Sequence, residues 1–206
     1  AAGFSEAAEA VGGDVVRCAR HRLEHVEMVD ANHLRVFAEF GVVASVQPVF
    51  DELWGGDSGM YVGRLGERRA RTLNPFSAMI DAGIPLALGS DAPVTPLGPW
   101  SAVRAAALHQ TPEHRISVRA AFNAHTRGGW RAAGLDAGGS LTVGAPANLA
   151  VWSASDLVVQ SPDDRVAAWS TDPRAGVPGL PTLESDAALP ICLRTVVRGS
   201  TVFVRD

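Results

Sequence analysis

The 206-residue chain has no lysine, so all 18 of its basic residues are arginines. They are scattered along the chain and are outnumbered by 22 acidic residues, which gives a formal net charge of −4. Proteins that bind nucleic acid or anionic membranes usually carry a concentrated basic stripe, which this sequence lacks. The expected partner is therefore a small molecule, with neither nucleic acid nor membrane.

Cysteines and long apolar runs are also scarce. Cys18 and Cys192 lie far apart and match no metal or redox spacing, which predicts two reduced, partly buried thiols and a cytoplasmic location. No window reaches the ~18 apolar residues of a membrane span, and the start, "AAGFSEAAEAVGG", does not resemble a signal peptide. The protein is expected to be soluble. Because the chain begins without methionine inside a helical pattern, we expect it to be one portion of a longer protein.

Strands and helices alternate through the first half of the chain. A short strand in "RHRLEHVEMVD" precedes a helix over 31–40, which Asp30 is placed to cap and Gly41 to end. The run "VVASVQP" predicts a second strand, and "IPLALGSD" a third after the helix in "TLNPFSAMIDAG". Continuous apolar runs such as 86–88 are typical of strands buried on both faces. The pattern predicts an α/β fold with a parallel sheet.

The segment 51–71 has five glycines and no clean period, which predicts a long loop or a broken helix. Its Trp54, Met60 and Tyr61 form either a lid over the substrate or the loop's own small core. Further on, "PWSAVRAAALH" and "SVRAAFNAHTRGGWRAAG" predict two more helices, the second capped by Ser117.

The last third of the chain changes in character. From Gly138 onward, short β-type runs alternate with turns, and a Pro/Gly/Asp-rich loop extends to about Ala188. The stretch "VRGST" has the composition of a hairpin turn. These features predict a small antiparallel β region.

Polar side chains stand at the three predicted strand exits: His25, Gln47 and the pair Ser90–Asp91. In parallel α/β barrels these exits meet at one mouth, where ligands bind. Imidazole and carboxylate groups bind zinc, and a carboxylate there can also carry a proton. Asp91 directly follows a buried strand, a costly position unless a cation or hydrogen-bond donors meet it. Structural explanations remain open, since a histidine at a strand end can be simply hydrogen-bonded and the aspartate of "SDAP" can be a turn residue.

Three stretches resemble, in order, the C-terminal part of metal-dependent amidohydrolases of the family 3 type, the group of N-acyl amino acid and amide deacylases. They are "RHRLEHVEMVD…FAEFGVVASVQPVF", "NPFSAMIDAGIPLALGSDAPV" and "GGSLTVGAPANLAVW". The resemblance implies that residues 1–136 are about the last three strands and helices of a (βα)8 TIM-type barrel. Residues 137–206 would be part of its small flanking β-sandwich. It also implies one or two divalent metal ions, with zinc favoured.

In this resemblance His25 is the sixth-strand metal ligand. Asp91 is the eighth-strand aspartate, which lies at the metal and passes a proton from the attacking water to the leaving amine. The family's first-strand His-x-His pair and its fifth-strand histidine are absent here, and without lysine no carboxylated lysine can form. The remaining ligands would lie in the missing N-terminal part of the barrel, so we expect this chain alone to be inactive.

Other residues are weaker candidates. Gln47 either orients substrate or simply ends its strand, Ser90 can donate to Asp91, and His125 either reaches the mouth from the last helix or packs there. A noncatalytic α/β binding or scaffold domain, with His25 and Asp91 structural, is the alternative function. Substrate identity and homo-oligomerisation are left open. Of the other histidines, His21 is expected to have a structural role, and His33, His109 and His114 are expected to be solvated.

Overall fold

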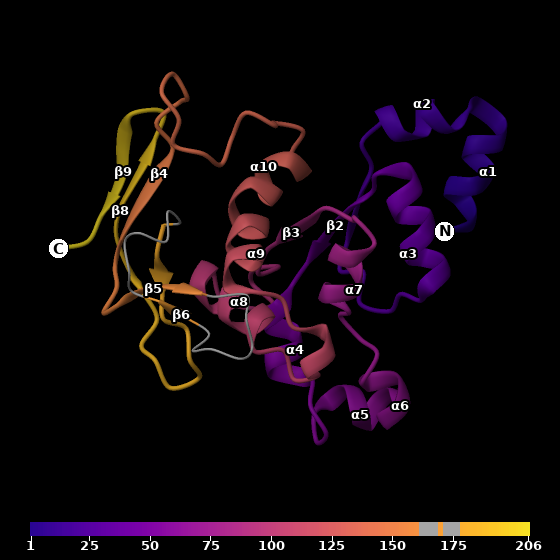
Figure 1. Ribbon diagram of the computed structural model, residues 1–206, viewed down its shortest axis with the longest axis horizontal. Coiled ribbons are helices and arrows are strands. Elements are labelled where there is room, and N and C mark those ends of the chain that lie inside the picture. Colours follow the sequence, from indigo (N-terminus) through magenta and orange to yellow (C-terminus); the bar gives the residue numbers. More distant parts are fainter. Residues whose placement is uncertain (161–168, 171–177) are drawn as a thin grey trace.

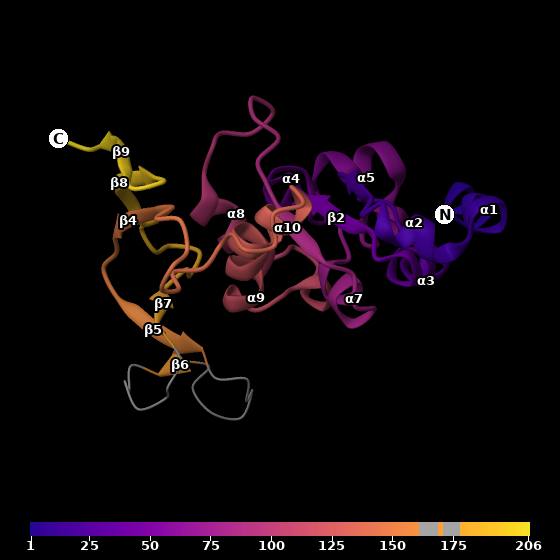
Figure 2. The same ribbon diagram turned by 90° about the horizontal axis from the view of Figure 1, so that it is seen from above.

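The structure is a computed structural model that describes residues 1–160, 169–170 and 178–206. The first 136 residues contain a parallel sheet with helices, and the rest form antiparallel strands at the opposite side of the molecule (Figures 1 and 2). The predicted α/β class is confirmed. No helix in the described part of the chain is long and apolar enough to cross a membrane.

The parallel sheet consists of β1 (Arg22–Glu24), β2 (Val43–Val46) and β3 (Leu86–Leu88), in the order β1-β2-β3. Leu23 pairs with Ala44, and the next residue of β2 pairs with Ala87. The central strand and β3 are almost completely buried, as their continuous apolar runs predict. Because all three strands run in the same direction, their carboxyl ends share one edge of the sheet.

Short helices surround this sheet. Those that precede the last helical run are α1 (Ala2–Val11), α2 (Gly13–Cys18), α3 (Ala31–Phe40), α4 (Pro48–Trp54), α5 (Met60–Leu65), α6 (Glu67–Ala70), α7 (Phe76–Asp81), α8 (Pro99–Ala107) and the 3₁₀ turn η1 (Pro112–His114). The segment 51–71 is thus a broken helix, and α2 was not predicted. The core lies between the helices and β2, where Val42, Phe76 and Met79 are 0% exposed.

The predicted helix caps are confirmed. The Asp30 carboxylate accepts the His33 backbone N–H at 3.0 Å, and Gly41 ends the same helix in the left-handed conformation. The Ser117 hydroxyl accepts the Ala120 N–H at 3.1 Å. The His33 side chain completes the cap of α3, with Nδ1 2.6 Å from Oδ1 of Asp30, and is 38% exposed, as predicted.

The last predicted helix is one helical run: α9 (Val118–Asn123), the π-helical turn η2 (Ala124–Gly128) and α10 (Gly129–Ala132). It packs closely on β3, because a Cβ atom added to Gly128 would lie 2.1 Å from the carbonyl oxygen of Leu86. Only a residue without a side chain allows this approach.

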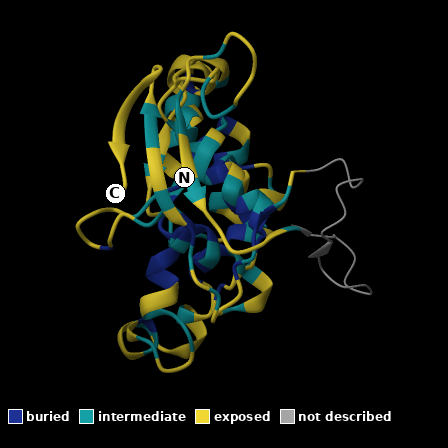
Figure 3. Ribbon diagram, turned by 90° about the vertical axis from the view of Figure 1, so that its left-hand side faces the viewer, coloured by how far each residue is buried: buried dark blue, intermediate teal, exposed yellow. Residues whose placement is uncertain are grey.

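Two antiparallel sheets follow. One has the order β4-β8-β9, with β4 (Leu149–Ser153), β8 (Ile191–Val197) and β9 (Ser200–Val204); the other has the order β6-β5-β7, with β6 (Trp169–Ser170), β5 (Leu157–Gln160) and β7 (Leu180–Pro181). The predicted hairpin joins β8 to β9 through Arg198 and Gly199, both at positive φ. Strand β9 is exposed along its whole length (Figure 3). Much of the predicted loop before Ala188 lies outside the described residues.

Both cysteines are free thiols. Cys192 is half-buried, as predicted, whereas Cys18 is exposed at the end of α2, so the prediction that both are partly buried is wrong for Cys18. The helix that carries it was not anticipated from the sequence, because its six residues are too few to show a period.

Candidate functional site

The carboxyl edge of the parallel sheet carries the predicted strand-exit residues. His25 directly follows β1, and its N–H still donates to the Ser45 carbonyl at 2.8 Å before the chain turns at φ 69°. Gln47 directly follows β2. Gly89, after β3, donates its N–H to the Val46 carbonyl at 3.0 Å. The backbone hydrogen bonds between the strands therefore continue to the residue that directly follows β1 and the residue that directly follows β3.

The side chains of His25 and Gln47 are hydrogen-bonded. Nδ1 of His25 lies 2.9 Å from Oε1 of Gln47, whose side chain is buried. An amide oxygen only accepts hydrogen bonds, so Nδ1 carries the proton and Nε2 keeps its lone pair. Phe50 stacks on the imidazole with 15° between the ring planes. Histidines that bind metals are commonly oriented in this way, with one nitrogen donating to the protein and the other free.

Asp91 is presented by a tight turn after β3. Its φ is 53° and its carbonyl accepts the Val94 N–H at 2.8 Å, while the buried Thr95 hydroxyl donates to the Ser90 carbonyl. The carboxylate itself is exposed, and within the described residues no donor is bonded to it. The expectation that Asp91 occupies a costly buried position is therefore wrong for this chain. The turn, not burial, fixes where the carboxylate stands.

His125 lies in η2, against β3, and its ring is half-buried. Burial lowers the pKa of this imidazole from its ordinary value. Across the described ranges, no hydrogen bond or ring contact joins His125 to His25, Gln47 or Asp91. The structure thus brings His25 and Gln47 into contact, and it shows no bond in the described residues from His125 to either of them.

A buried polar cluster beside the segment after β2 was not predicted from the sequence. His109 is 1% exposed, so the prediction that it is solvated is wrong. Its Nδ1 accepts the Thr111 N–H at 2.9 Å and lies 3.4 Å from Oδ2 of Asp51, which is itself buried and accepts the Gln110 N–H at 2.8 Å. Burial lowers the pKa of His109 to about 4 and raises that of Asp51 to about 6.

This cluster gave no signal in the sequence because its two ionisable members are far apart along the chain and neither stands at a strand exit. Nε2 of His109 and Nδ2 of Asn74 are buried there, and among the residues that the structure describes neither has a hydrogen-bond partner. Buried donors without a partner are uncommon in folded proteins.

The aromatic residues of 51–71 form the segment's own small core. Trp54 contacts the rings of Phe50 and Tyr61, with centroid distances of 4.6 and 6.1 Å. The buried Tyr61 hydroxyl donates to Glu27 at 2.5 Å, and burial raises the pKa of this phenol. Met60 is 47% exposed. Trp54 and Tyr61 thus belong to the small core of this segment, which was one of the two predicted alternatives; the other was a lid over the substrate.

The residues at the carboxyl edge fit part of a metal site. His25 offers a free imidazole nitrogen and Asp91 an exposed carboxylate, which are both common zinc ligands. Throughout the residues that the structure describes, no three His, Cys, Asp or Glu side chains gather closely enough to hold a metal ion. Two ligands from this chain would thus need further ligands from elsewhere.

Comparisons with known proteins agree with this reading. Residues 2–203 match the amidohydrolase family. The protein LONG AFTER FAR-RED 3 of Arabidopsis thaliana is 34% identical over 158 residues, which are 72% of this chain and 26% of that protein.

Among solved structures, a metal-dependent hydrolase of Pyrococcus furiosus is 27% identical with a TM-score of 0.55, over 66% of this chain and 30% of that one. A mutant atrazine chlorohydrolase TrzN of Arthrobacter aurescens, solved with zinc and atraton, is 25% identical with a TM-score of 0.55, over 88% of this chain and 35% of that one. The chain thus spans about a quarter to a third of the length of these relatives. The predicted resemblance is confirmed, and the chain belongs to the amidohydrolase family.

Proposed function

We propose that the chain supplies part of the active site of a metal-dependent hydrolase that cleaves an amide or related non-peptide C–N bond in a small molecule. Family membership and the zinc in a related structure support this assignment. In the proposal β1, β2 and β3 are three neighbouring strands of a (βα)8 barrel within residues 1–136. The antiparallel strands of residues 137–206 belong to a flanking β-sandwich.

One observation carries the proposal. The hydrogen bond from His25 to Gln47 leaves the Nε2 lone pair of His25 free, at the same sheet edge where the turn after β3 presents the Asp91 carboxylate. An imidazole held by one nitrogen with the other free is the arrangement usual for a metal-binding histidine. Gln47 accordingly acts by orienting His25, and Ser90 and His125 remain candidates for substrate contact.

His25 and Asp91 would hold one or two divalent ions, with zinc as the first candidate. Such an ion polarises a carbonyl group and lowers the pKa of water. Asp91 would accept the proton of the attacking water and deliver it to the departing nitrogen, a role suited to an exposed carboxylate with no ion-pair partner in the described residues. The Gln47 amide and the Phe50 ring would keep the His25 imidazole from rotating.

The other ligands would come from the N-terminal part of the barrel, since the relatives are three to four times as long as the matched region. We therefore expect the isolated chain to be inactive, and the intact protein to act on its small-molecule substrate in the cytoplasm.

Elemental analysis of the full-length protein tests the proposal. We expect bound zinc or another divalent metal, lost in His25→Ala and retained in His21→Ala, which removes an exposed histidine at the other end of β1. Hydrolysis of N-acyl amino acids and simple amides should follow the metal content. A metal-free wild type, or equal metal content in both variants, would favour the noncatalytic scaffold instead.

A further inference from the structure

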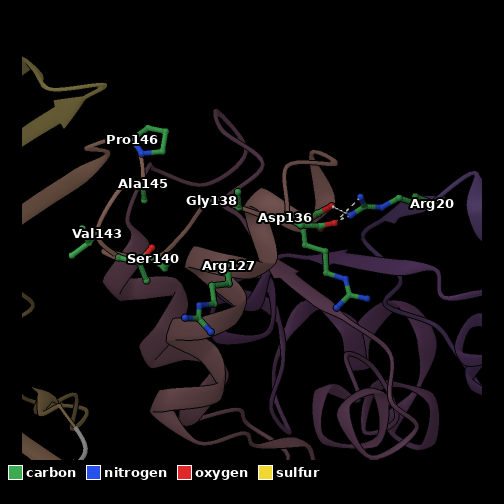
Figure 4. A pocket seen from close by; sticks show the side chains of 12 residues that line it. Arg20, Arg127, Asp136, Gly138, Ser140, Val143, Ala145 and Pro146 are labelled. Carbon is green, nitrogen blue, oxygen red and sulfur yellow. Dashed lines mark hydrogen bonds and ion pairs between the residues drawn. The ribbon is translucent and has the colours of Figure 1, made fainter.

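We propose that a second site, at the opposite edge of the sheet, binds the phosphate group of a small phosphorylated molecule. A hollow of about 970 Å³ lies between the helical run η2–α10 and the loop 137–146 (Figure 4). Arg20, which borders it, stands two residues before β1, and η2 meets β3 at the first residue of that strand. The hollow is thus on the amino side of the sheet, away from His25 and Asp91, and the proposal is independent of the proposed function.

Two arginines form the cationic wall of this hollow. Arg127 and Arg131 are four residues apart on one helical run, so their side chains share a face. In the described part of the chain neither guanidinium has a hydrogen-bond acceptor. Like charges at this spacing destabilise a helix by ~0.2–0.5 kcal/mol unless a counter-charge is present. An anion in the hollow would remove that repulsion.

The third arginine is already neutralised. The Arg20 guanidinium donates two hydrogen bonds to the Asp136 carboxylate, from Nη1 to Oδ2 at 2.9 Å and from Nη2 to Oδ1 at 2.6 Å. Figure 4 shows this pair at one end of the hollow. This contact is the main cause of the lowered pKa of the Asp136 carboxyl group, with a smaller contribution from Arg131. The fixed pair closes the hollow on that side and leaves two positive charges in excess.

The opposite wall of the hollow is the loop 137–146, which packs directly against the helical run η2–α10. A Cβ atom added to Gly138 would lie 2.2 Å from Cδ2 of Trp130, and one added to Gly139 would lie 2.8 Å from the Arg127 backbone. Side chains at these two positions would push the loop away. Their absence brings the hydroxyl groups of Ser140 and Thr142 to the lining of the same hollow as the arginines.

This donor set fits a phosphate group. Guanidinium groups bind phosphate oxygens through paired N–H donors, and hydroxyl groups complete the shell of a doubly charged tetrahedral anion. The hollow is larger than inorganic phosphate needs and lies within the ~300–1,000 Å³ of ordinary small-molecule sites. Ala145 and Pro146 give it an apolar side for the organic part of the ligand.

Isothermal titration in a phosphate-free buffer at constant ionic strength tests the proposal, with glucose 6-phosphate, inorganic phosphate and glucose as probes. We expect saturable binding of glucose 6-phosphate, and no binding of glucose. Equal affinity for inorganic phosphate would identify the free ion as the ligand, and weaker affinity a phosphorylated molecule. Both results support a phosphate site.

Variants locate the binding. Arg127→Gln and Arg131→Gln should each weaken it at least tenfold, and Thr142→Val should weaken it by a smaller factor. Arg68→Gln, which removes an exposed arginine of α6, should leave it unchanged. Of the residues substituted here, only Arg127 and Arg131 place a charge in the hollow. Circular dichroism of each variant verifies its fold. No saturable heat, or equal weakening by Arg68→Gln, would overturn the proposal.

Discussion

The amide oxygen of Gln47 accepts the Nδ1 proton of His25 over 2.9 Å, and this contact fixes which nitrogen of the imidazole is free. The carbonyl end of the amide is the acceptor, so the ring is held as the Nδ1–H tautomer. The contact joins the ends of two neighbouring parallel strands. It therefore couples the position of a candidate metal ligand to the register of the sheet.

Replacement of Gln47 by methionine should release this constraint. Met has a similar length but no strong acceptor, so we expect His25 to become a mixture of its two tautomers. Nitrogen-15 chemical shifts of the imidazole report the tautomer directly. Gln110→Met, at an exposed glutamine, should leave the His25 shifts unchanged. If Gln47→Met also leaves them unchanged, Gln47 does not orient the ring. In the metal-loaded full-length protein, loss of such a partner typically weakens metal binding 10- to 100-fold.

Asp91→Asn should separate catalysis from folding. The side chain is exposed and no donor in the described residues depends on its charge, so the free energy of unfolding should change by less than ~0.5 kcal/mol. Loss of a proton carrier should lower kcat of the full-length protein by a factor of ~10²–10⁴. Asp186→Asn, at another exposed aspartate, should retain activity. Activity near the wild-type value in Asp91→Asn would remove Asp91 from the proton transfer.

The sequence predicted those features that depend on a few neighbouring residues. Asp30 and Ser117 indicate where two helices begin, because the side chain of a capping residue accepts a backbone N–H only three residues further along the chain. The strand exits were also predictable, since a buried apolar run followed by a polar residue defines each one. Contacts between distant segments were not predictable, and the burial of His109 against Asp51 is the clearest case.

The candidate site was predictable only as a set of strand-exit residues. That Gln47 would bond to His25 follows from the parallel register of β1 and β2, which no local pattern specifies. The exposure of Asp91 depends on a turn whose geometry the stretch "SDAP" does not determine. Gly128 likewise looked like an ordinary helical glycine until its approach to β3 was seen.

The adjacent glycines 128 and 129 provide a matched pair for testing that approach. Both have helical φ and ψ angles, so alanine suits the backbone at either position. At Gly129 an added Cβ meets nothing within 4 Å, and Gly129→Ala should stabilise the protein by ~0.5–1 kcal/mol. At Gly128 the Cβ would lie 2.1 Å from the Leu86 oxygen, and we expect a destabilisation of ~1–3 kcal/mol. Urea denaturation measures both, and equal effects would contradict the close packing of η2 on β3.

Asp51 and His109 should contribute to the pH dependence of stability in opposite directions. Burial raises the pKa of Asp51 from 3.8 to about 6, so between these values the folded protein holds a proton that the unfolded chain has lost. Its contribution to stability grows as the pH falls through that window. Burial lowers the pKa of His109 from 6.5 to about 4, so the unfolded chain binds the extra proton there. The contribution of His109 therefore declines as the pH falls from 6.5 to about 4.

In the wild type these two contributions largely cancel, and single substitutions should expose each one. For Asp51→Asn the free energy of unfolding should fall, relative to wild type, by up to ~1.4 kcal/mol per pH unit as the pH drops, since one titrating proton sets that slope. His109→Gln should give the opposite slope, and the double variant should follow the wild type again. Urea denaturation across the window between the shifted pKa values, about 4 and about 6, measures these slopes. Parallel curves for all four proteins would mean that neither group changes its pKa on folding.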